Sequence, residues 1–262
     1  MFSGFNVRVD KNTIGEDYYY NIGRKIAYEN EAIVCENLKK YVCEANSLHG
    51  NLIATDWFPE IEADIFLSHS HKDENFVVSF AGWLYEVFGL YTFIDSMVWG
   101  YSNDLLKMID DTYCLRPSGS YSYERRNFST SHVHMMLSVA LTKMIDKCES
   151  VFFVNTPNSI TVSKSIKAAD YTFSPWLYAE IEMTRLIRRK KLLEYRQVLV
   201  HDSKYALTEN LRIRYDVSLE HLENLDDNDL ITWWKKGKKN ICEKPMDMLY
   251  EIKGIWGGSV NG

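Results

Sequence analysis

The sequence predicts an α/β fold in which a mostly parallel, doubly wound sheet is covered by helices. Short apolar runs alternate with longer segments of helical periodicity, which is the pattern of βαβ units. Apolar residues make up 46% of the 262 residues, so one main domain with a sizeable core can form. Ligands bind such sheets outside the carboxyl ends of the strands, which directs the search for a site.

Five segments are expected to be strands: 63–68, 90–95, 150–156, 197–201 and 213–217. Helices are expected between them, because apolar residues recur there at i, i+3/i+4 and i+7, over 76–88, 104–109, 131–145 and 174–189. Residues 113–130 are interpreted as an irregular insertion, after which Ser131 is expected to cap a long helix. The connection at 161–171 is also long, and both insertions could cover the site or form an oligomer contact.

Three parts of the chain are distinguished by their patterns. Residues 1–60 are interpreted as a helical N-terminal extension, because isolated apolar residues alternate with charges over most of this stretch. Residues 61–240 hold the alternating strands and helices and form the main domain. Residues 241–262 end in GIWGGSVNG and are interpreted as a C-terminal tail.

Charge and cysteine usage exclude several classes of protein. The net charge of −6 gives no support for a nucleic-acid interface, which is usually basic. The five cysteines match no zinc or redox spacing, and their odd number does not indicate a disulfide framework, so a reducing compartment is expected. The start of the chain lacks the apolar segment of a signal peptide, and no apolar run reaches the ~20 residues that span a bilayer. A soluble, cytoplasmic protein with neither nucleic acid nor membrane as a partner is therefore expected.

The segment SPWLYAEI indicates a helix start followed by a conspicuous carboxylate. Ser174 is a favourable N-cap, and Pro175 suits the first helical position. On a helical wheel, Glu180 falls inside the apolar arc, which is expected to consist of Trp176, Ala179, Met183, Leu186 and Ile187. Either Glu180 lies at the edge of this stripe and pairs with a cation or backbone donors, or it points into a pocket and takes part in a reaction. The wheel leaves both readings open.

A second polar segment, SHSHKD, follows the first predicted strand. Small hydroxyls and a lysine at a strand end can line a phosphate or ribose site. The pairs His69/His71 and His132/His134 also suggest metal ligands, but a third ligand at a recognisable spacing is missing, so no metal site is expected. The common sequence motifs of dinucleotide-binding, P-loop, α/β-hydrolase and zincin proteins do not occur.

These segments resemble the Toll/interleukin receptor (TIR) domain family. ADIFLSHSHKD is similar to the family's opening strand, SVFFVNTPNS to the strand and turn that often end in Ser-Pro-Asn, and SPWLYAEI to the S-x-W-C-x-x-E-L helix, with Leu177 where Cys is common. The resemblance covers roughly residues 63–220 and implies a flavodoxin-like, five-stranded sheet. Residues 96–102 depart from the family, because they lack the Pro-Gly common in receptor TIR domains.

The resemblance also implies an activity. In enzymatic TIR domains the glutamate of this helix is the catalytic residue for NAD⁺ cleavage, and Glu180 matches it. The chain is further similar to the TIR subunits of bacterial anti-phage systems of the Thoeris kind, which make a signalling nucleotide from NAD⁺. We therefore expect an NAD⁺ glycohydrolase or ADP-ribosyl cyclase that uses NAD⁺ as substrate and needs no cofactor. A homo-oligomer, a downstream effector that responds to the product and a phage-derived trigger are the expected partners.

Six further residues are expected to contact the substrate: Ser68, His69, Lys72, Asp95, Trp99 and Trp176. Each also has a structural alternative, such as a solvated side chain for Lys72 or a core position for Trp176. Two other functions stay open, namely a non-catalytic TIR scaffold that works by self-association or partner binding and a domain that binds a nucleotide without turnover.

Overall fold

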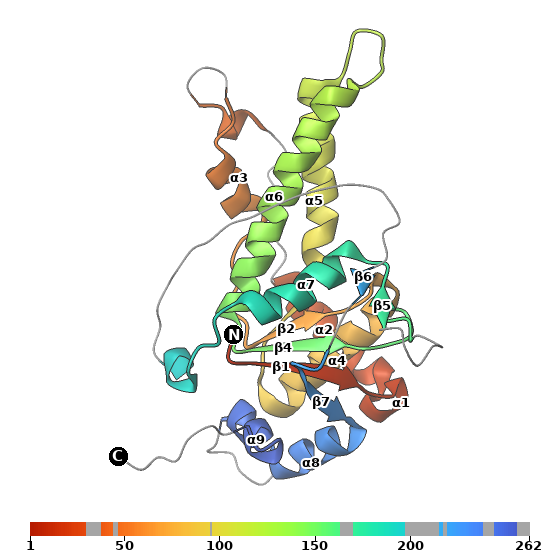
Figure 1. Cartoon of the computed structure of the whole chain (residues 1–262), viewed down its shortest axis with the longest axis vertical. Coiled ribbons are helices and arrows are strands. Elements are labelled where there is room, and N and C mark those ends of the chain that lie inside the picture. The colour runs from red at the N-terminus through yellow and green to blue at the C-terminus, as the bar shows by residue number, and fades with distance from the viewer. Residues whose placement is uncertain are drawn as a thin grey trace.

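The computed structural model describes residues 1–29, 38–43, 47–94, 96–162, 170–196, 215–216, 219–237 and 244–255. At its centre is a five-stranded sheet in the order β3-β2-β4-β1-β7, in which every neighbouring pair is parallel (Figure 1). The strands are β1 (Ser3–Arg8), β2 (Ile65–Ser68), β3 (Thr92–Ile94), β4 (Ser150–Val154) and β7 (Glu223–Asp226). The predicted α/β class with a parallel sheet is confirmed, and β2, β3 and β4 lie inside predicted strands.

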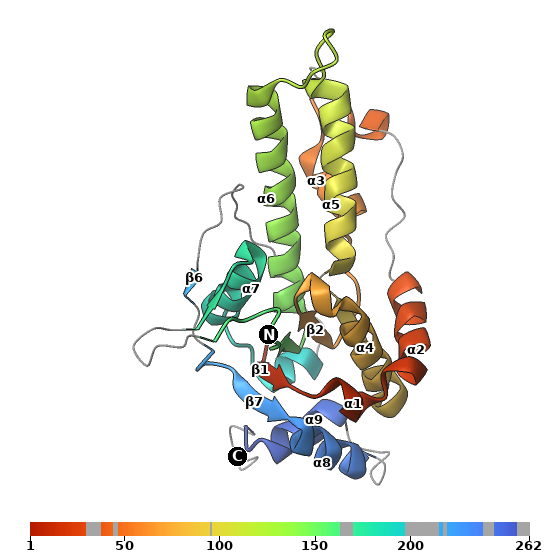
Figure 2. The ribbon, with the colours of Figure 1, turned by 90° about the vertical axis from the view of Figure 1, so that its right-hand side faces the viewer.

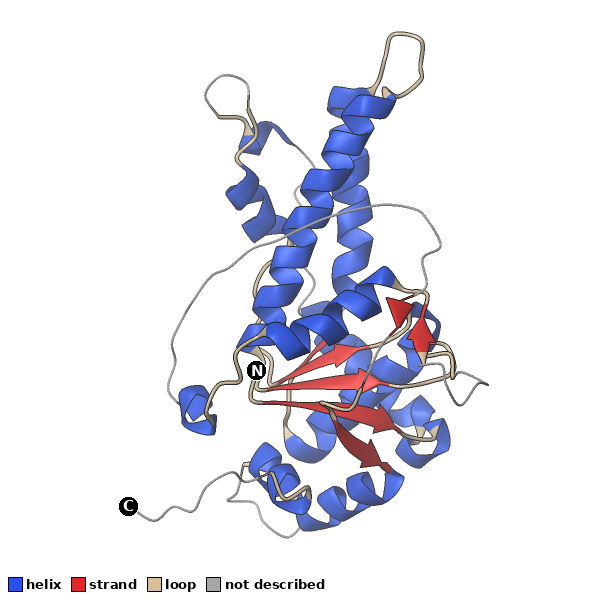
Figure 3. Ribbon diagram, in the orientation of Figure 1, coloured by secondary structure: helices blue, strands red, loops and turns tan. Residues whose placement is uncertain are grey.

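Helices cover both faces of the sheet (Figure 3). They are α1 (Lys11–Ile14), α2 (Glu16–Glu29), α3 (Gly50–Trp57), α4 (Glu74–Phe88), α5 (Ser96–Ile109), α6 (Tyr123–Lys147), α7 (Pro175–Leu186), α8 (Asp227–Gly237) and α9 (Pro245–Ile252). One core cluster joins the sheet to α4, α8 and α9, and a second joins its other face to α3, α5 and α6. Alternate residues of β2, β3 and β4 pack into the two clusters, as expected for strands that are buried on both faces.

The first strand corrects the expectation of a wholly helical N-terminal extension. Residues 3–8 form β1, which lies inside the sheet between β4 and β7. Its sequence, SGFNVR, places Phe5 and Val7 in the core on one face and Gly4 and Asn6 on the other. Because this strand lacks the continuous apolar run of most buried parallel strands, its sequence gave no strand signal.

The C-terminal part of the chain also differs from the expectation. Residues 223–226 form the edge strand β7, and α9 contributes Met246, Met248, Leu249 and Tyr250 to the core, although 241–262 was interpreted as a tail. The expected strand 197–201 lies outside the described residues. Within 213–217, Tyr215–Asp216 form β6, which pairs antiparallel with β5 (Tyr171–Thr172) in a separate two-stranded sheet.

Two helices project from the sheet as an antiparallel hairpin (Figure 2). The expected loop at 96–102 is the first part of α5, and α6 begins at Tyr123 with Ser122 as its N-cap, so Ser131 lies inside the helix and part of the expected insertion is helical. Arg126 binds the buried Asp110 at 2.8 Å and links the two helices near their tip. The first turns of α6, YERRNFST, lack apolar periodicity because they extend beyond the core. For this reason the sequence predicted the helix only from residue 131 onward.

The order of the strands places the reversal point next to β2 and β4. The chain leaves β2 for β3 on one side, whereas it leaves β4 for β7 on the other side. Adjacent strands with diverging connections open a crevice at their carboxyl ends. Here those ends carry Ser68 and His69 after β2, and Asn155 and Thr156 after β4.

Candidate functional site

The helix α7 begins as its sequence predicts. Ser174 has extended backbone geometry and its side chain accepts a hydrogen bond from the Leu177 amide at 3.2 Å, while Pro175 occupies the first turn. Both features fix where the helix starts, because the cap satisfies one of the free N–H groups of the first turn. The position of every later side chain on α7 follows from this start.

The carboxylate of Glu180 is enclosed, with only 1% of the residue exposed. The buried face of α7 consists of Leu177, Glu180, Ile181 and Thr184, which differs from the predicted stripe, since Leu186 is 83% exposed. The difference arises because one side of α7 packs on the sheet and another side packs on the cluster that contains α6. Leu177 and Ile181 pack toward Phe153 of the sheet, while Trp176, Met183 and Ile187 pack against the cluster that contains α6.

Ser68 brings the two predicted segments together. Its hydroxyl donates a hydrogen bond to Oε2 of Glu180 at 2.6 Å, and both residues are buried. In β2, Ile65 and Leu67 point to one core cluster, so Ser68 points to the opposite face, over which α7 lies. A short hydroxyl-to-carboxylate bond of this kind is charge-assisted and fixes the orientation of the carboxylate.

The other residues predicted after β2 have different environments. His69 is buried, with 3% exposed, and its Nδ1 lies 3.4 Å from the Leu67 carbonyl oxygen, so it is not the solvated side chain of the structural alternative. Lys72 is exposed in the 3₁₀ turn His71–Asp73. Asp95 lies outside the described residues. Trp99 belongs to α5, but its side chain is likewise not described.

Trp176 packs against the helical hairpin. Its ring contacts His134 of α6 edge-on, with centroids 5.6 Å apart and an interplanar angle of 75°, and it packs against the cluster that contains α3, α5 and α6. This environment favours the core reading of Trp176 over stacking on a substrate ring. His132 contacts Phe128 instead, so the two histidines of the α6 pair lie against different rings.

A polar clasp that the sequence did not predict joins the ends of β2 and β4. Asp73 is 1% exposed, accepts a hydrogen bond from Asn158 Nδ2 at 2.8 Å and binds the hydroxyl of Thr156 through its other oxygen. Ser159 then accepts from the Thr156 amide at 2.9 Å. These bonds fix the loop that follows β4. The only sign of the clasp in the sequence is Asp73, the last residue of the SHSHKD segment, for which no role was predicted.

A row of asparagines continues along the same edge of the sheet. Asn155 and Asn6 are joined at 2.9 Å through their carboxamides, and Asn6 and Asn224 at 3.2 Å. A guanidinium can only donate, so the Asn155 oxygen faces Arg8 and accepts from its Nε at 3.1 Å and from a terminal nitrogen at 3.2 Å. The same oxygen is the Asn155 atom that lies 2.9 Å from Asn6, so the Asn6 carboxamide donates to it through its amide group. Asn6 is 3% exposed, whereas Arg8 is exposed. Sequence reasoning missed this row because it missed β1 and β7.

A hollow of about 530 Å³ lies one turn beyond Glu180 along α7 and does not contain that carboxylate; it is lined by Thr184, Arg185, Arg189, Glu220 and His221. Arg185 donates to His221 Nδ1 at 3.1 Å, so the ring proton of a neutral His221 lies on Nε2 and is donated to Thr184 at 2.8 Å. Arg189 donates to the His221 carbonyl oxygen at 2.9 Å. These bonds attach the loop before β7 to α7.

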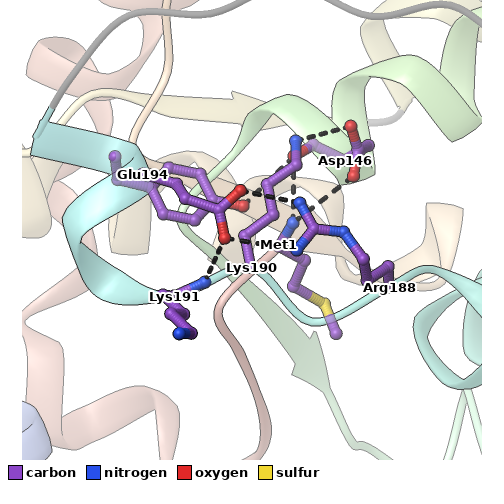
Figure 4. A network of polar contacts seen from close by, with 7 residues as sticks. Met1, Asp146, Arg188, Lys190, Lys191 and Glu194 are labelled. Carbon is purple, nitrogen blue, oxygen red and sulfur yellow. Dashed lines mark hydrogen bonds and ion pairs between the residues drawn. The ribbon is translucent and has the colours of Figure 1, made fainter.

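The C-terminal end of α7 is anchored by a network around Asp146 (Figure 4). Lys190 Nζ lies 2.5 Å from Asp146 Oδ2, and the Met1 α-amino group donates to the Asp146 carbonyl oxygen at 2.9 Å. Burial, with a smaller contribution from the Lys190 charge, lowers the pKa of that amino group to about 5. Glu194 pairs with Arg188 at 2.6 Å, which with the Lys191 amide lowers the pKa of Glu194 to about 2. Both ends of the helix that carries Glu180 are therefore fixed.

Among the described residues, no group of three His, Cys, Asp or Glu side chains lies close enough together to hold a metal ion. None of the helices in the described part of the chain has the length and hydropathy needed to cross a membrane.

Comparison of the chain with models of protein families, with curated proteins and with solved structures found no match in any of the three. The resemblance to TIR domains therefore rests on the three sequence motifs.

Proposed function

We propose that the chain is a TIR-type enzyme that cleaves the nicotinamide–ribose bond of NAD⁺, with Glu180 as the catalytic residue. The observation that carries the proposal is the buried carboxylate of Glu180 and its 2.6 Å bond from Ser68 at the carboxyl end of β2. Burying a carboxylate on the core side of a helix is costly, and a purely structural role would be met by an apolar side chain. Buried carboxylates at the carboxyl ends of parallel strands, where such sheets bind ligands, are typical of functional sites.

The chemistry of the reaction suits a single fixed anion. When the bond between the ribose C1′ and the nicotinamide nitrogen breaks, the electron pair leaves with nicotinamide, which becomes neutral, and positive charge develops on the ribose. Glu180 would stabilise that charge and accept hydrogen bonds from ribose hydroxyls. A glycosidase needs two carboxylates because its leaving group must be protonated, whereas nicotinamide needs no acid. The ribose hydroxyls would replace or join the Ser68 hydroxyl at the Glu180 oxygens.

The product depends on what captures the cation. Attack by water gives ADP-ribose and releases a proton, whereas attack by a hydroxyl or ring nitrogen of the same molecule gives a cyclic product. Which group captures the cation is set by the shape and the water content of the occupied site. A cyclic, signalling nucleotide would fit the resemblance to the TIR subunits of anti-phage systems.

The test is nicotinamide release from NAD⁺ by concentrated protein, with and without lysate of phage-infected cells, followed by mass spectrometry of the products. We expect release by the wild type and loss of at least about a hundredfold in Glu180→Gln, because the fixed charge that faces the cation is removed. No release by folded wild type under either condition would contradict the proposal. The product mass separates hydrolysis from cyclisation.

A second candidate function is a scaffold that self-associates through the tip of the α5–α6 hairpin. Aromatic side chains are exposed there, with Tyr123 at 74% and Phe128 at 71%, next to Leu115 at 48%. Exposed apolar groups gathered on one projection are typical of interaction sites. Light scattering of the wild type and of Phe128→Ser tests it: an oligomer that dissociates in the variant supports self-association through the tip, and a monomeric wild type contradicts it.

A further inference from the structure

The register of the sheet aligns Glu180's partner with the asparagine row. Ser68 of β2 is opposite Phe153 of β4, which is opposite Asn6 of β1, and Asn6 is opposite Asn224 of β7. Opposed residues in paired strands point to the same face, so all four point toward the side covered by α7. Three of these four residues are polar, whereas Phe153, between Ser68 and Asn6, is buried and packs with Leu177 and Ile181 of α7. We refer to the line from Ser68 to Asn224 as the strip.

We propose that this strip binds the adenosine diphosphate half of NAD⁺, with Arg8 on the diphosphate and the asparagine carboxamides on the adenosine. The inference rests on the proposed function, because it takes the nicotinamide ribose to lie at Glu180. It assigns a substrate-binding role to β1 and β7, two strands with no part in the three motifs of the resemblance.

The spacing of the strands sets the distances along the strip. Neighbouring strands lie about 4.8 Å apart, so the backbone of Asn6 is roughly 10 Å from that of Ser68 and that of Asn224 roughly 14 Å. Arg8 lies two residues farther along β1, about 7 Å closer to the carboxyl edge. A dinucleotide whose first ribose is at Glu180 extends over distances of this order, and its charged diphosphate would reach the exposed end of the strip at Arg8.

The groups on the strip suit these two parts of the ligand. The Arg8 side chain is exposed, and a guanidinium has five donors in a planar fork that matches the oxygens of a phosphate. Asn155 accepts from two of its nitrogens, which orients the fork. A carboxamide presents one acceptor and two donors, the pattern that pairs with the adenine N6 and N7 edge.

A structural role alone explains the row poorly. Parallel strands buried on both faces are usually filled with Val, Ile and Leu, and hydrogen-bonded polar groups contribute little net stability over apolar ones of the same shape. Asn6 is nevertheless 3% exposed at the centre of the sheet. Asp226 of β7 is opposite Arg8 and is the nearest candidate for a structural ion pair with it. However, its Oδ1 already accepts a hydrogen bond from the Asp229 amide at the start of α8.

The experiment compares two substrates in one assay. Nicotinamide riboside contains the scissile bond but lacks the whole adenosine diphosphate half. Arg8→Gln is expected to raise KM for NAD⁺ at least about tenfold, because one charge-assisted hydrogen bond is lost, and to leave KM for the riboside within about twofold. Asn224→Asp places a negative charge beside the strip and is expected to act in the same direction. Arg116→Gln removes an exposed cation at the hairpin tip and is the matched control.

A binding measurement separates this inference from the proposed function. Calorimetric titration of the wild type with ADP should show binding that Arg8→Gln weakens at least about tenfold, with the fold checked by circular dichroism. If NAD⁺ is cleaved but Arg8→Gln affects both substrates equally, the inference is overturned and the function stands. If NAD⁺ is not cleaved but ADP binding depends on Arg8, the binding site on the strip is supported and the proposed enzymatic function is contradicted. Wild type that binds no ADP and cleaves no NAD⁺ overturns both.

Discussion

Replacing Ser68 by alanine tests the bond at the centre of the site. The hydroxyl donates to a carboxylate at 2.6 Å, and both residues are 1% exposed, so the interaction is screened little by solvent. A hydrogen bond to a charged group contributes about 1.5–3 kcal/mol, and its loss also leaves a buried carboxylate less well solvated. Glu180 keeps other contacts in the variant, which favours the lower half of that range. We expect Ser68→Ala to lower the free energy of unfolding by about 2 kcal/mol.

The assay is urea unfolding followed by tryptophan fluorescence, with thermal unfolding as a second readout. A loss of about 2 kcal/mol corresponds to a decrease in Tm of roughly 4–8 °C for a chain of this size. Ser79→Ala is the matched control, because Ser79 is fully buried and its hydroxyl donates at 3.0 Å to the Asn75 carbonyl oxygen inside α4. That acceptor is uncharged, and alanine is a good helix former, so we expect a change within about 1 kcal/mol.

A double-mutant cycle with Glu180→Gln isolates the pair. The coupling energy between Ser68→Ala and Glu180→Gln should be about 1 kcal/mol or more, because the amide accepts a weaker hydrogen bond than the carboxylate. If Ser68→Ala costs no more than Ser79→Ala, or if the two changes at the site are additive, the reasoning about a buried, charge-assisted bond is wrong.

Two further predictions concern the core and the anchor of α7. Burial raises the pKa of the Cys148 thiol to about 12. Iodoacetamide should therefore modify the exposed Cys43 in the native protein and reach Cys148 only in urea, as followed by peptide mass spectrometry; native labelling of both at one rate would contradict the packing. Asp146→Asn should cost about 1–2 kcal/mol in urea unfolding, because Lys190 loses a partly buried carboxylate. Glu62→Gln removes the pair with Lys147 at 2.7 Å, where Glu62 is 93% exposed, and should change stability by less than about 1 kcal/mol; equal effects would refute this ranking.

The sequence predicted those elements whose signals are local. β2 and β4 are short apolar runs, α4 has a regular apolar stripe, and α7 begins at the predicted cap, Ser174. The meeting of Ser68 with Glu180 was predictable because the carboxyl ends of parallel strands face the crevice at the reversal point. The helical wheel also placed Glu180 on a buried face. Trp176, Met183 and Ile187 of the predicted stripe pack against the core, whereas Leu186 is exposed.

The elements that were missed take their structure from distant contacts. β1 is a strand because it inserts between β4 and β7, and its polar Asn6 makes sense only beside Asn155 and Asn224. α9 is held by core contacts and by the Tyr250 hydroxyl, which donates to Glu149 at 2.8 Å across more than a hundred residues. No local pattern encodes such pairings, since propensity and periodicity describe only neighbours along the chain.

The most direct test of the central claim compares two neighbouring glutamates of α7 in one assay. Glu180 is enclosed, whereas Glu182 is partly exposed and pairs with Arg185 at 3.2 Å. Nicotinamide release from NAD⁺ would be measured for the wild type, Glu180→Gln and Glu182→Gln at equal, high concentration. The account predicts activity in the wild type and in Glu182→Gln and loss of at least about a hundredfold in Glu180→Gln. Equal activity in all three, or none in the folded wild type, would contradict it.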